Sequence, residues 1–457
     1  MFKSYFTQKY FLDTSDFVLT PLYFLFFFIL LQFLAKTQKK ENQAYFIKAG
    51  IAKLVAAIFF SLIYYAVYGG GDTSQYFTFG KRINISFFEE SPTFFFKILF
   101  SHGQFDSETE ILTRYMDWYS DKSSFLIVKI VSVLCFFSFQ TFIPIAMFFA
   151  FFSFLGLWKL FLIFSEENPL HKKHIWLAIF FVPSTLFWSS GILKDGIVLA
   201  ALCFSFCGFY EFYKKGKFSF KNIFYFVAGA YIVYYIKSYV LACFLSMFLI
   251  PLTHSQLVSK KRSLVFKFLV VLVSFFTLAI VIYQMVNSAS WQKELEELSE
   301  NIAISANYLY YMSELSQGSG YTLGELDGSI QSVLSKIHLA VFTTLYRPFI
   351  WESKNATMLL SAIESTFMII LTLYIIFFAN KKYILYRFRS DGFFISTLLT
   401  TIVFGTLVGL SSYNFGTLVR YKIPILPFLV TMLFLCIKKK QKSVIKKPHI
   451  TSEFQEK

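Results

Sequence analysis

Long apolar runs dominate this chain, and short polar segments separate them. Several of the runs reach the roughly 20 residues that an α-helix needs to cross a bilayer, and others fall slightly short of that length. The pattern predicts an all-α, polytopic integral membrane protein with about 11 transmembrane helices and helices lying at its outer surface. The predicted spans are 17–35, 49–68, 141–164, 176–192, 196–212, 223–236, 238–252, 264–284, 357–379, 393–411 and 424–437.

Two charged positions change how the apolar runs are divided. Lys237 lies in the middle of 223–252, and a charge near the bilayer centre is costly, so we predict two short helices that meet at the polar turn IKSY. Lys129 lies in the middle of 123–139, which we interpret as an interfacial or half-inserted helix. If 123–139 crossed the membrane, everything upstream would change sides.

Basic loops set the predicted orientation, because short cytoplasmic loops of membrane proteins are rich in Lys and Arg. They place the long loops 69–122 and 286–356 outside, together with the N-terminus. We therefore predict one polytopic domain over 1–440, a basic cytoplasmic tail over 441–457, and a multi-pass location in the inner (cytoplasmic) membrane. The basic loops are 36–40, 171–174, 214–217, 259–262, 380–389 and 438–447.

Composition narrows the possible partners. The chain is 56% hydrophobic and carries a net charge of +16, but its Lys and Arg are spread over loops. A nucleic-acid surface would gather them on one domain, so we expect membrane lipid and no nucleic acid as partners. The five Cys lie in apolar segments and the six His show no ligand spacing, so we expect no metal site. No motif identifies a cofactor or an oligomeric state.

Polar residues cluster at the ends of four apolar runs, and the predicted topology places all four ends on the outer face. The first cluster, GGGDTSQYF at 69–77, has three glycines that permit tight turns, followed at once by Asp72. Asp72 either caps a helix or serves as a functional carboxylate at the start of the outer loop. The other clusters are 183–195, 346–352 and 420–427.

The second and third clusters add charges of both signs. Lys194 and Asp195 follow an apolar stretch broken by Pro183, and they either form a polar turn or hold a phosphate. Arg347 precedes a proline and lies five positions before Glu352. This arginine either grips an anionic ligand or anchors a surface helix through an ion pair with Glu352.

The fourth cluster, RYKIPILP, carries cations where the positive-inside rule disfavours them. Arg420 and Lys422 enter a predicted span from the outer side, which suggests an anionic partner there. Pro424 and Pro427 make the helix start irregular, and irregular backbone at membrane depth is tolerated where it lines a cavity.

These clusters resemble those of bacterial membrane glycosyltransferases of the GT-C kind, over about 70–440. Asp72 resembles the carboxylate of the first large outer loop, and KIVSVL at 129–134 resembles an Arg-x-x-Ser step before a core span. PSTLFWSSGILKD resembles the Pro-containing outer turn, and RYKIPILP the Arg-Tyr-x-x-Pro-x-x-Pro entry to a late span. The acid pair of the protein-mannosylating branch is absent, because Thr73 follows Asp72. The chain is also similar to oligosaccharide repeat-unit polymerases.

The resemblance implies a glycosyltransferase that takes a sugar or oligosaccharide from a polyprenyl-phosphate donor at the outer face, in cell-envelope glycan or polysaccharide synthesis. Asp72 would be the catalytic base. A transporter or flippase, or a non-catalytic membrane component, remains the alternative of another class. The residues expected to bind the lipid-linked donor or to border its site are Lys194, Asp195, Lys237, Arg347, Glu352, Arg420 and Lys422.

Overall fold

The computed structural model describes residues 11–215, 219–258, 300, 302–312, 319–324, 327, 329–354 and 356–439. Helices make up most of these residues, and an isolated bridge between Gly320 and Asn414 is the extent of their β-structure. In chain order the elements are α2 (Thr14–Ala35), α3 (Lys40–Ile63), η1 (Tyr64–Tyr68), α4 (Asp72–Glu89), α5 (Pro92–Phe100), α6 (Glu110–Thr113), α7 (Lys122–Ser138), α8 (Phe142–Glu167), η2 (Pro169–His171), α9 (Lys172–Phe180), α10 (Pro183–Trp188), α11 (Lys194–Lys215), α12 (Phe220–Val258), α15 (Ile330–Ser335), α16 (Ile337–Tyr346), η3 (Ile350–Glu352), α17 (Ala356–Phe378), α18 (Lys381–Ser390), α19 (Gly392–Ser412), α20 (Phe415–Tyr421) and α21 (Leu426–Leu435).

The described helices confirm an all-α polytopic membrane protein. Seven of them are long and apolar enough to cross a bilayer, and the pair α20 and α21, bent by 70°, would make eight. The difference from the expected number has three sources. Residues 176–192 form the short helices α9 and α10, residues 264–284 lie outside the described part of the chain, and 223–252 counts as one helix.

The predicted break at Lys237 is confirmed. Lys237 has non-helical backbone angles (φ −145°, ψ 76°) inside α12. The ring centroids of Phe226 and Phe248 lie 5.6 Å apart, whereas 22 residues of straight helix would span about 33 Å. The two halves of α12 therefore fold back on each other, and Lys237 lies at the turn between them.

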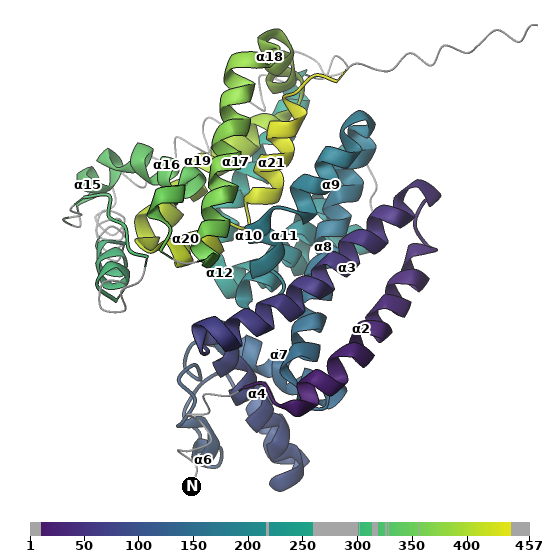
Figure 1. Cartoon of the computed structure of the whole chain (residues 1–457), viewed down its shortest axis with the longest axis vertical. Coiled ribbons are helices and arrows are strands. Elements are labelled where there is room, and N and C mark those ends of the chain that lie inside the picture. The colour runs from purple at the N-terminus through teal and green to yellow at the C-terminus, as the bar shows by residue number, and fades with distance from the viewer. Residues whose placement is uncertain are drawn as a thin grey trace, which may run out of the picture.

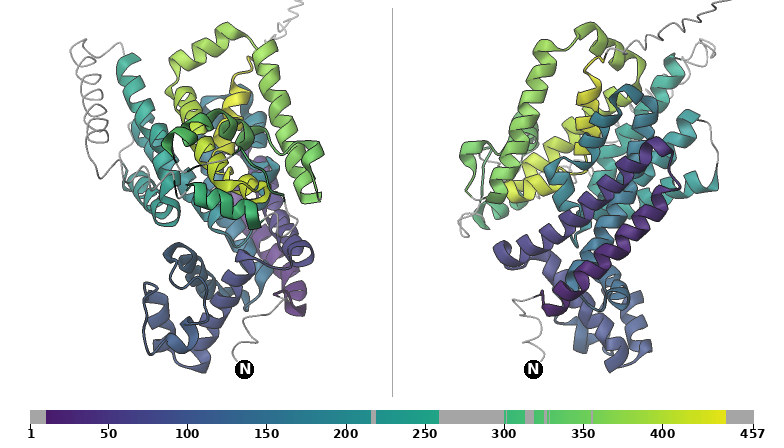
Figure 2. Two further views of the ribbon diagram at one scale, coloured as in Figure 1. Left: turned by 90° about the vertical axis from the view of Figure 1, so that its left-hand side faces the viewer. Right: turned by 45° about the vertical axis from the view of Figure 1, so that its right-hand side comes forward.

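The spanning helices pack as a bundle around α8 and α11 (Figures 1 and 2). Helix α11 contacts α8 on one side and α12 on another, and α3 packs against α8. Gly156 makes the α8–α11 contact possible, because a Cβ at this position would lie 2.6 Å from the Cα of Ala200. Helix α2 lies at the edge of the bundle, where Phe17, Leu22 and other apolar side chains remain exposed.

Basic segments meet at one end of the bundle. The loop between α2 and α3 reaches the C-terminal end of α8 through Lys39 and Glu166, whose charged atoms are 2.9 Å apart. Lys172 at the start of α9 pairs with Glu41 at 3.1 Å. The loop before α3 and the segment around η2 and the start of α9, both assigned to one side by the positive-inside rule, are therefore brought together. Further contacts at this end join Arg387 to Asn168, His171 to Ile437 and Lys439 to His174.

A helical lobe lies at the opposite end of α3 and contains α4, α5, α6 and α7 (Figure 1). Helices α4 and α7 run parallel, because Tyr76 contacts Ser124 and Asn84 contacts the Ser132 carbonyl, both with a separation of 48 positions. Gly80 allows the close approach, since a Cβ there would lie 2.5 Å from Val131. Helix α7 is the expected helix over 123–139, and it is not among the seven long apolar helices. Its interfacial position remains a prediction.

Candidate functional site

The three glycines of the first cluster shape the backbone that presents Asp72. Helix α3 ends in the π-helical turn η1, and Gly69, Gly70 and Gly71 all have positive φ angles of 65°, 121° and 131°. Side chains rarely adopt such angles, so the glycines permit the turn into α4. Ser74 caps the new helix by accepting from the Gly71 N–H at 3.0 Å. The Asp72 carboxylate therefore does not cap α4.

Arg420 holds the Asp72 carboxylate. Nη1 of Arg420, near the end of α20, donates to Oδ2 of Asp72 over 2.8 Å. The Asp72 side chain keeps 40% of its surface exposed, whereas that of Arg420 keeps 15%. An exposed carboxylate is thus fixed in position by a mostly buried guanidinium.

Asp195 lies between two cations behind Asp72. Its Oδ2 accepts from Nε of Arg420 and its Oδ1 accepts from Nζ of Lys237, both over 2.5 Å. The Asp195 side chain is only 1% exposed. Burying a carboxylate is tolerable when cations and hydrogen bonds satisfy it, and the first turn of α11 adds a favourable helix dipole. We call Asp72, Asp195, Lys237 and Arg420 the charge cluster.

Lys194 and Asp121 extend the charge cluster toward the lobe. Nζ of Lys194 donates to Oδ2 of Asp121 over 3.0 Å and to the Ser123 hydroxyl over 2.7 Å. Burial raises the pKa of Asp121, but hydrogen bonds from Ser124 and Ser123 and the charge of Lys194 outweigh it and hold that pKa well below its usual range. Asp121 was not singled out from the sequence, because nothing local distinguishes it from an ordinary helix N-cap.

Aromatic side chains surround the charge cluster. The Nζ of Lys237 lies 4.4 Å from the centroid of the Tyr421 ring, a cation–π contact. Tyr76 is one turn after Asp72 on α4 and contacts Ser124, which in turn donates to Asp121 over 2.5 Å. The site is therefore a group of charged side chains flanked by tyrosine rings. The starts of α4, α7 and α11, the turn of α12, and α20 form it.

Arg347 and Glu352 are not part of the charge cluster. They form a local ion pair, in which Nε of Arg347 donates to Oε1 of Glu352 over 3.0 Å. The guanidinium also lies over the Phe415 and Tyr321 rings, 5.0 and 5.5 Å from their centroids. Arg347 was expected either to bind an anionic ligand or to pair with Glu352, and the geometry matches the ion pair. This pair anchors the chain just before α17.

Lys422 also lies apart from the charge cluster, although it follows Arg420 by two positions. It is completely buried and pairs with Glu364 of α17 at 3.6 Å. Oε2 of the same Glu364 accepts from the Ser184 N–H over 2.6 Å. Lys422 cannot reach an anionic ligand outside the protein in this arrangement, because its amine is enclosed by α17, α20 and the start of α10.

A second buried cation was missed by sequence reasoning. Lys53 in the middle of α3 is completely buried, and its Nζ donates to the backbone carbonyl and hydroxyl of Ser189 over 3.0 and 2.7 Å. The only sequence signal was a lysine inside a predicted span, and intramembrane ionisable groups are functional candidates by default. Its oxygen partners come from the irregular segment between α10 and α11.

The described residues contain no group of three His, Cys, Asp or Glu side chains that could hold a metal ion. Comparison with models of known families, with curated proteins and with solved structures found no match. The fold is that of an all-α multi-pass membrane protein.

Proposed function

We propose that this chain is a membrane glycosyltransferase that takes a sugar or oligosaccharide from a polyprenyl-phosphate carrier at the outer face of the inner membrane. The product would belong to a cell-envelope glycan or polysaccharide. The observation that carries the proposal is the exposed Asp72 carboxylate, fixed against Arg420 at the end of the bundle opposite the basic loops.

Asp72 has the features of a general base. It is exposed enough to meet an acceptor hydroxyl, and a base must lie within hydrogen-bond reach of the proton it takes. In the reaction the acceptor oxygen attacks the anomeric carbon, and its proton passes to Asp72. The bond from that carbon to the phosphate oxygen breaks, and the phosphate leaves on its lipid carrier.

Arg420 can serve the leaving phosphate while it holds the base. Its Nε and Nη1 donate to Asp195 and Asp72, and Nη2 has no hydrogen-bond partner among the described residues. A guanidinium can donate several hydrogen bonds at once, and a positioned cation stabilises negative charge that develops on a leaving group. One side chain would therefore bring base and phosphate together.

Lys194 and Lys237 would support the phosphate from the sides. Each is paired with a carboxylate, Lys194 with Asp121 and Lys237 with Asp195, so the donor would share these cations. A repeat-unit polymerase is a second form of the same proposal. It would use the same chemistry on a longer acceptor, and the length of the product distinguishes the two.

Transport is the second candidate, and a specific observation favours it. Lys53 and Glu364 are buried inside apolar helices and Lys422 is buried at the end of α20, and a transporter would place the groups of an ion or proton pathway at such positions. A transferase does not require these three residues. The glycosyltransferase proposal remains first because it accounts for the exposed carboxylate and the unengaged guanidinium nitrogen.

The test compares two variants in membranes supplied with a lipid-linked sugar pool. Asp72→Asn keeps size but removes basicity, so product formation should fall while photo-crosslinking of a donor analogue persists. Arg420→Ala should reduce the crosslinking, and Arg420→Lys should restore only part of it, because an ammonium group lacks the planar set of donors that lets Arg420 contact Asp72, Asp195 and the phosphate together. Ser107→Ala, at an exposed position of the lobe, is the control. Normal product from both Asp72→Asn and Arg420→Ala would refute the proposal.

A further inference from the structure

The lobe carries an exposed aromatic surface. We call this surface the aromatic ridge. Phe100 is 72% exposed and Phe139 is 73% exposed, which is unusual for such large apolar side chains gathered in one place. The exposed members of the ridge are Phe88 at the end of α4, Phe96 and Phe100 on α5, and Phe137 and Phe139 at the end of α7.

The ridge is continuous across the three helices. The Phe136 ring lies 6.0 Å from Phe88 and 5.5 Å from Phe95, so it joins α4, α5 and α7. Phe96 stacks with Phe100, with centroids 6.2 Å apart and planes 15° apart. The rings of α4 and α5 therefore form one surface with Phe136, and Phe137 and Phe139 follow Phe136 directly along the chain.

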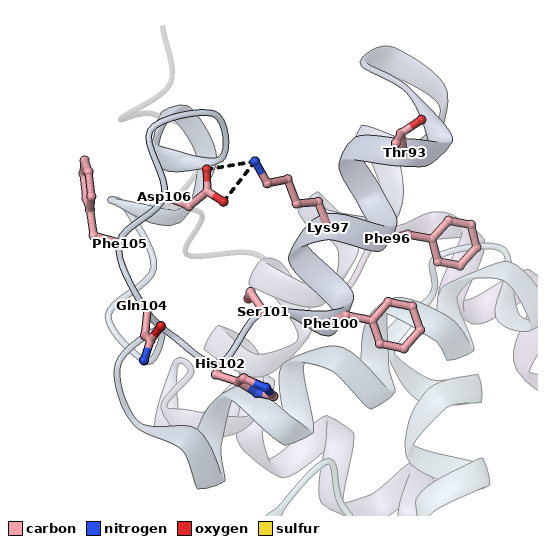
Figure 3. Close-up of a pocket in the computed structure, with 9 residues that line it drawn as sticks. All are labelled: Thr93, Phe96, Lys97, Phe100, Ser101, His102, Gln104, Phe105 and Asp106. Atoms are coloured by element: carbon pink, nitrogen blue, oxygen red, sulfur yellow. Dashed lines mark hydrogen bonds and ion pairs between the residues drawn. The ribbon is translucent and has the colours of Figure 1, made fainter.

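Helix α5 carries the charged Lys97 next to the aromatic Phe96 and close to Phe100 (Figure 3). Lys97 points across a groove of about 580 Å³ to Asp106, with charged atoms 3.0 Å apart. Phe96 and Phe100 point away from Asp106 in this view, and both also border the groove (Figure 3). A short helix that combines exposed aromatic side chains with a lysine has the composition of a helix that lies in a membrane interface.

The end of α7 is tied to a span that faces lipid. The Tyr23 hydroxyl donates to the Phe137 carbonyl, and Tyr23 is in the first half of α2. Phe17 and Leu22 of α2 are exposed in the surrounding turns, so this face of α2 contacts lipid tails. Phe137 therefore lies beside the lipid-facing surface, at a depth reached by a spanning helix.

The charge of α7 is turned away from the ridge. Nζ of Lys129 donates to the Ser101 carbonyl over 2.6 Å, on the groove side of α5, and lies over the Phe125 ring. The lysine that argues against a spanning α7 is thus satisfied inside the lobe. Because Lys129 is hydrogen-bonded there, placing the ridge in lipid would not bury an unpaired charge.

We propose that the aromatic ridge is embedded in the lipid leaflet that the N-terminal end of α2 enters. The bilayer is the partner because the ridge continues the lipid-facing surface of α2 and carries no charge of its own. Embedding fixes α4 and α7 at the interface, and these helices present Asp72 and Asp121 at their starts. The charge cluster is thereby held near the level of lipid head groups. This inference does not depend on the proposed transfer reaction.

The test uses spin labels on the full-length chain in nanodiscs of phosphatidylcholine and phosphatidylglycerol. Labels at Phe96→Cys and Phe100→Cys report on the ridge, and Phe88→Cys repeats the measurement on α4. Gln104→Cys and Ser107→Cys, at exposed positions of the loop between α5 and α6, are the matched controls. The native cysteines are all buried, and unmutated protein gives their background signal. Oxygen, which concentrates in lipid, is compared with a water-soluble nickel chelate as the relaxing agent.

The ridge labels should relax more with oxygen than with the nickel chelate, and the two controls should show the reverse. Ridge labels as accessible to nickel as the controls would overturn the proposal. Labels shielded from both agents, with spin–spin broadening that disappears when labelled protein is diluted with unlabelled protein, would also overturn it. That result would show a second copy of the chain on the ridge in place of lipid.

Discussion

Arg420 donates to Asp72 across 348 positions of sequence and to Asp195 across 225. The same guanidinium therefore contacts one carboxylate that is exposed and another that is buried. The two acids should differ in what their loss does to the protein. The buried acid supports the fold, and the exposed acid is available for chemistry.

The two carboxylates give a first prediction about stability. Asp195→Asn leaves Arg420 and Lys237 without their shared partner, and breaking a buried ion pair costs about 3–5 kcal/mol. Asp72→Asn, at a position that keeps much of its surface exposed, should cost about 1 kcal/mol or less. Thermal unfolding of purified protein in detergent measures both. Equal losses for the two variants would contradict the division of roles.

Packing of the central bundle gives a matched pair of glycine variants. Gly156→Ala puts a methyl group 2.6 Å from the Ala200 backbone, and forced overpacking typically costs about 1–3 kcal/mol. Gly405→Ala makes the identical change where the nearest atom lies 3.7 Å away, so it should be neutral or stabilising through helix propensity. Gly156→Ala should therefore lower the unfolding temperature, and Gly405→Ala should leave it unchanged or raise it. A stabilised Gly156→Ala would show that α8 and α11 are less closely packed.

The Lys194–Asp121 pair predicts a pH dependence. The pKa of Asp121 is lower in the folded protein than in the unfolded chain, so its contribution to stability is present above the unfolded value of about 4 and is lost as the pH falls below it. Lys194→Met removes one cause of the lowered pKa. Less of the stability near neutral pH should then depend on this carboxylate.

Unfolding temperatures measured from about pH 7 to about pH 3 test this, because that range spans the ordinary carboxylate pKa. The unmutated protein should lose more stability over the range than Lys194→Met. Lys382→Met, at an exposed lysine of α18, is the control and should follow the unmutated curve. Identical curves for all three proteins would remove the pair from the stability of the fold.

Sidedness is tested with single cysteines and an impermeant thiol reagent in intact cells. Ser107→Cys in the lobe should be labelled, and Ser390→Cys at the basic end should be labelled only after permeabilisation. Both positions are exposed, whereas Thr73 beside Asp72 is completely buried and would report poorly. The reverse pattern would place the charge cluster on the cytoplasmic side and contradict the proposed outer-face donor.

The sequence predicted local features well because their causes are local. Glycine permits the positive φ angles before Asp72, and the charge of Lys237 disfavours a continuous span. The end of the bundle at which Lys194 and Arg420 meet followed from topology. Which carboxylate each cation contacts did not, because the pairings join α11 to α20 and α7 across the bundle.

Positions inside apolar runs were the hardest to interpret. Glu364 was a single acid in the run at 357–379, and the structure shows that it pairs with Lys422. The sequence did not reveal this pair, so Lys422 was predicted to face an anionic partner outside, whereas its amine is buried within the protein. Asp121 was missed for a different reason, because a helix N-cap and a ligand of Lys194 have the same sequence signature. Only tertiary packing separates these cases.

The central claim is that the charge cluster transfers a sugar from a lipid carrier, and reconstitution tests it most directly. Purified chain in liposomes, given a fluorescent lipid-linked oligosaccharide and an acceptor, should form a new glycosidic bond and release the polyprenyl phosphate carrier in equal amount. Asp72→Asn should slow this by about 10²–10⁴-fold, as loss of a general base does. No transfer, with movement of the lipid-linked sugar between leaflets instead, would contradict the account and identify a transporter.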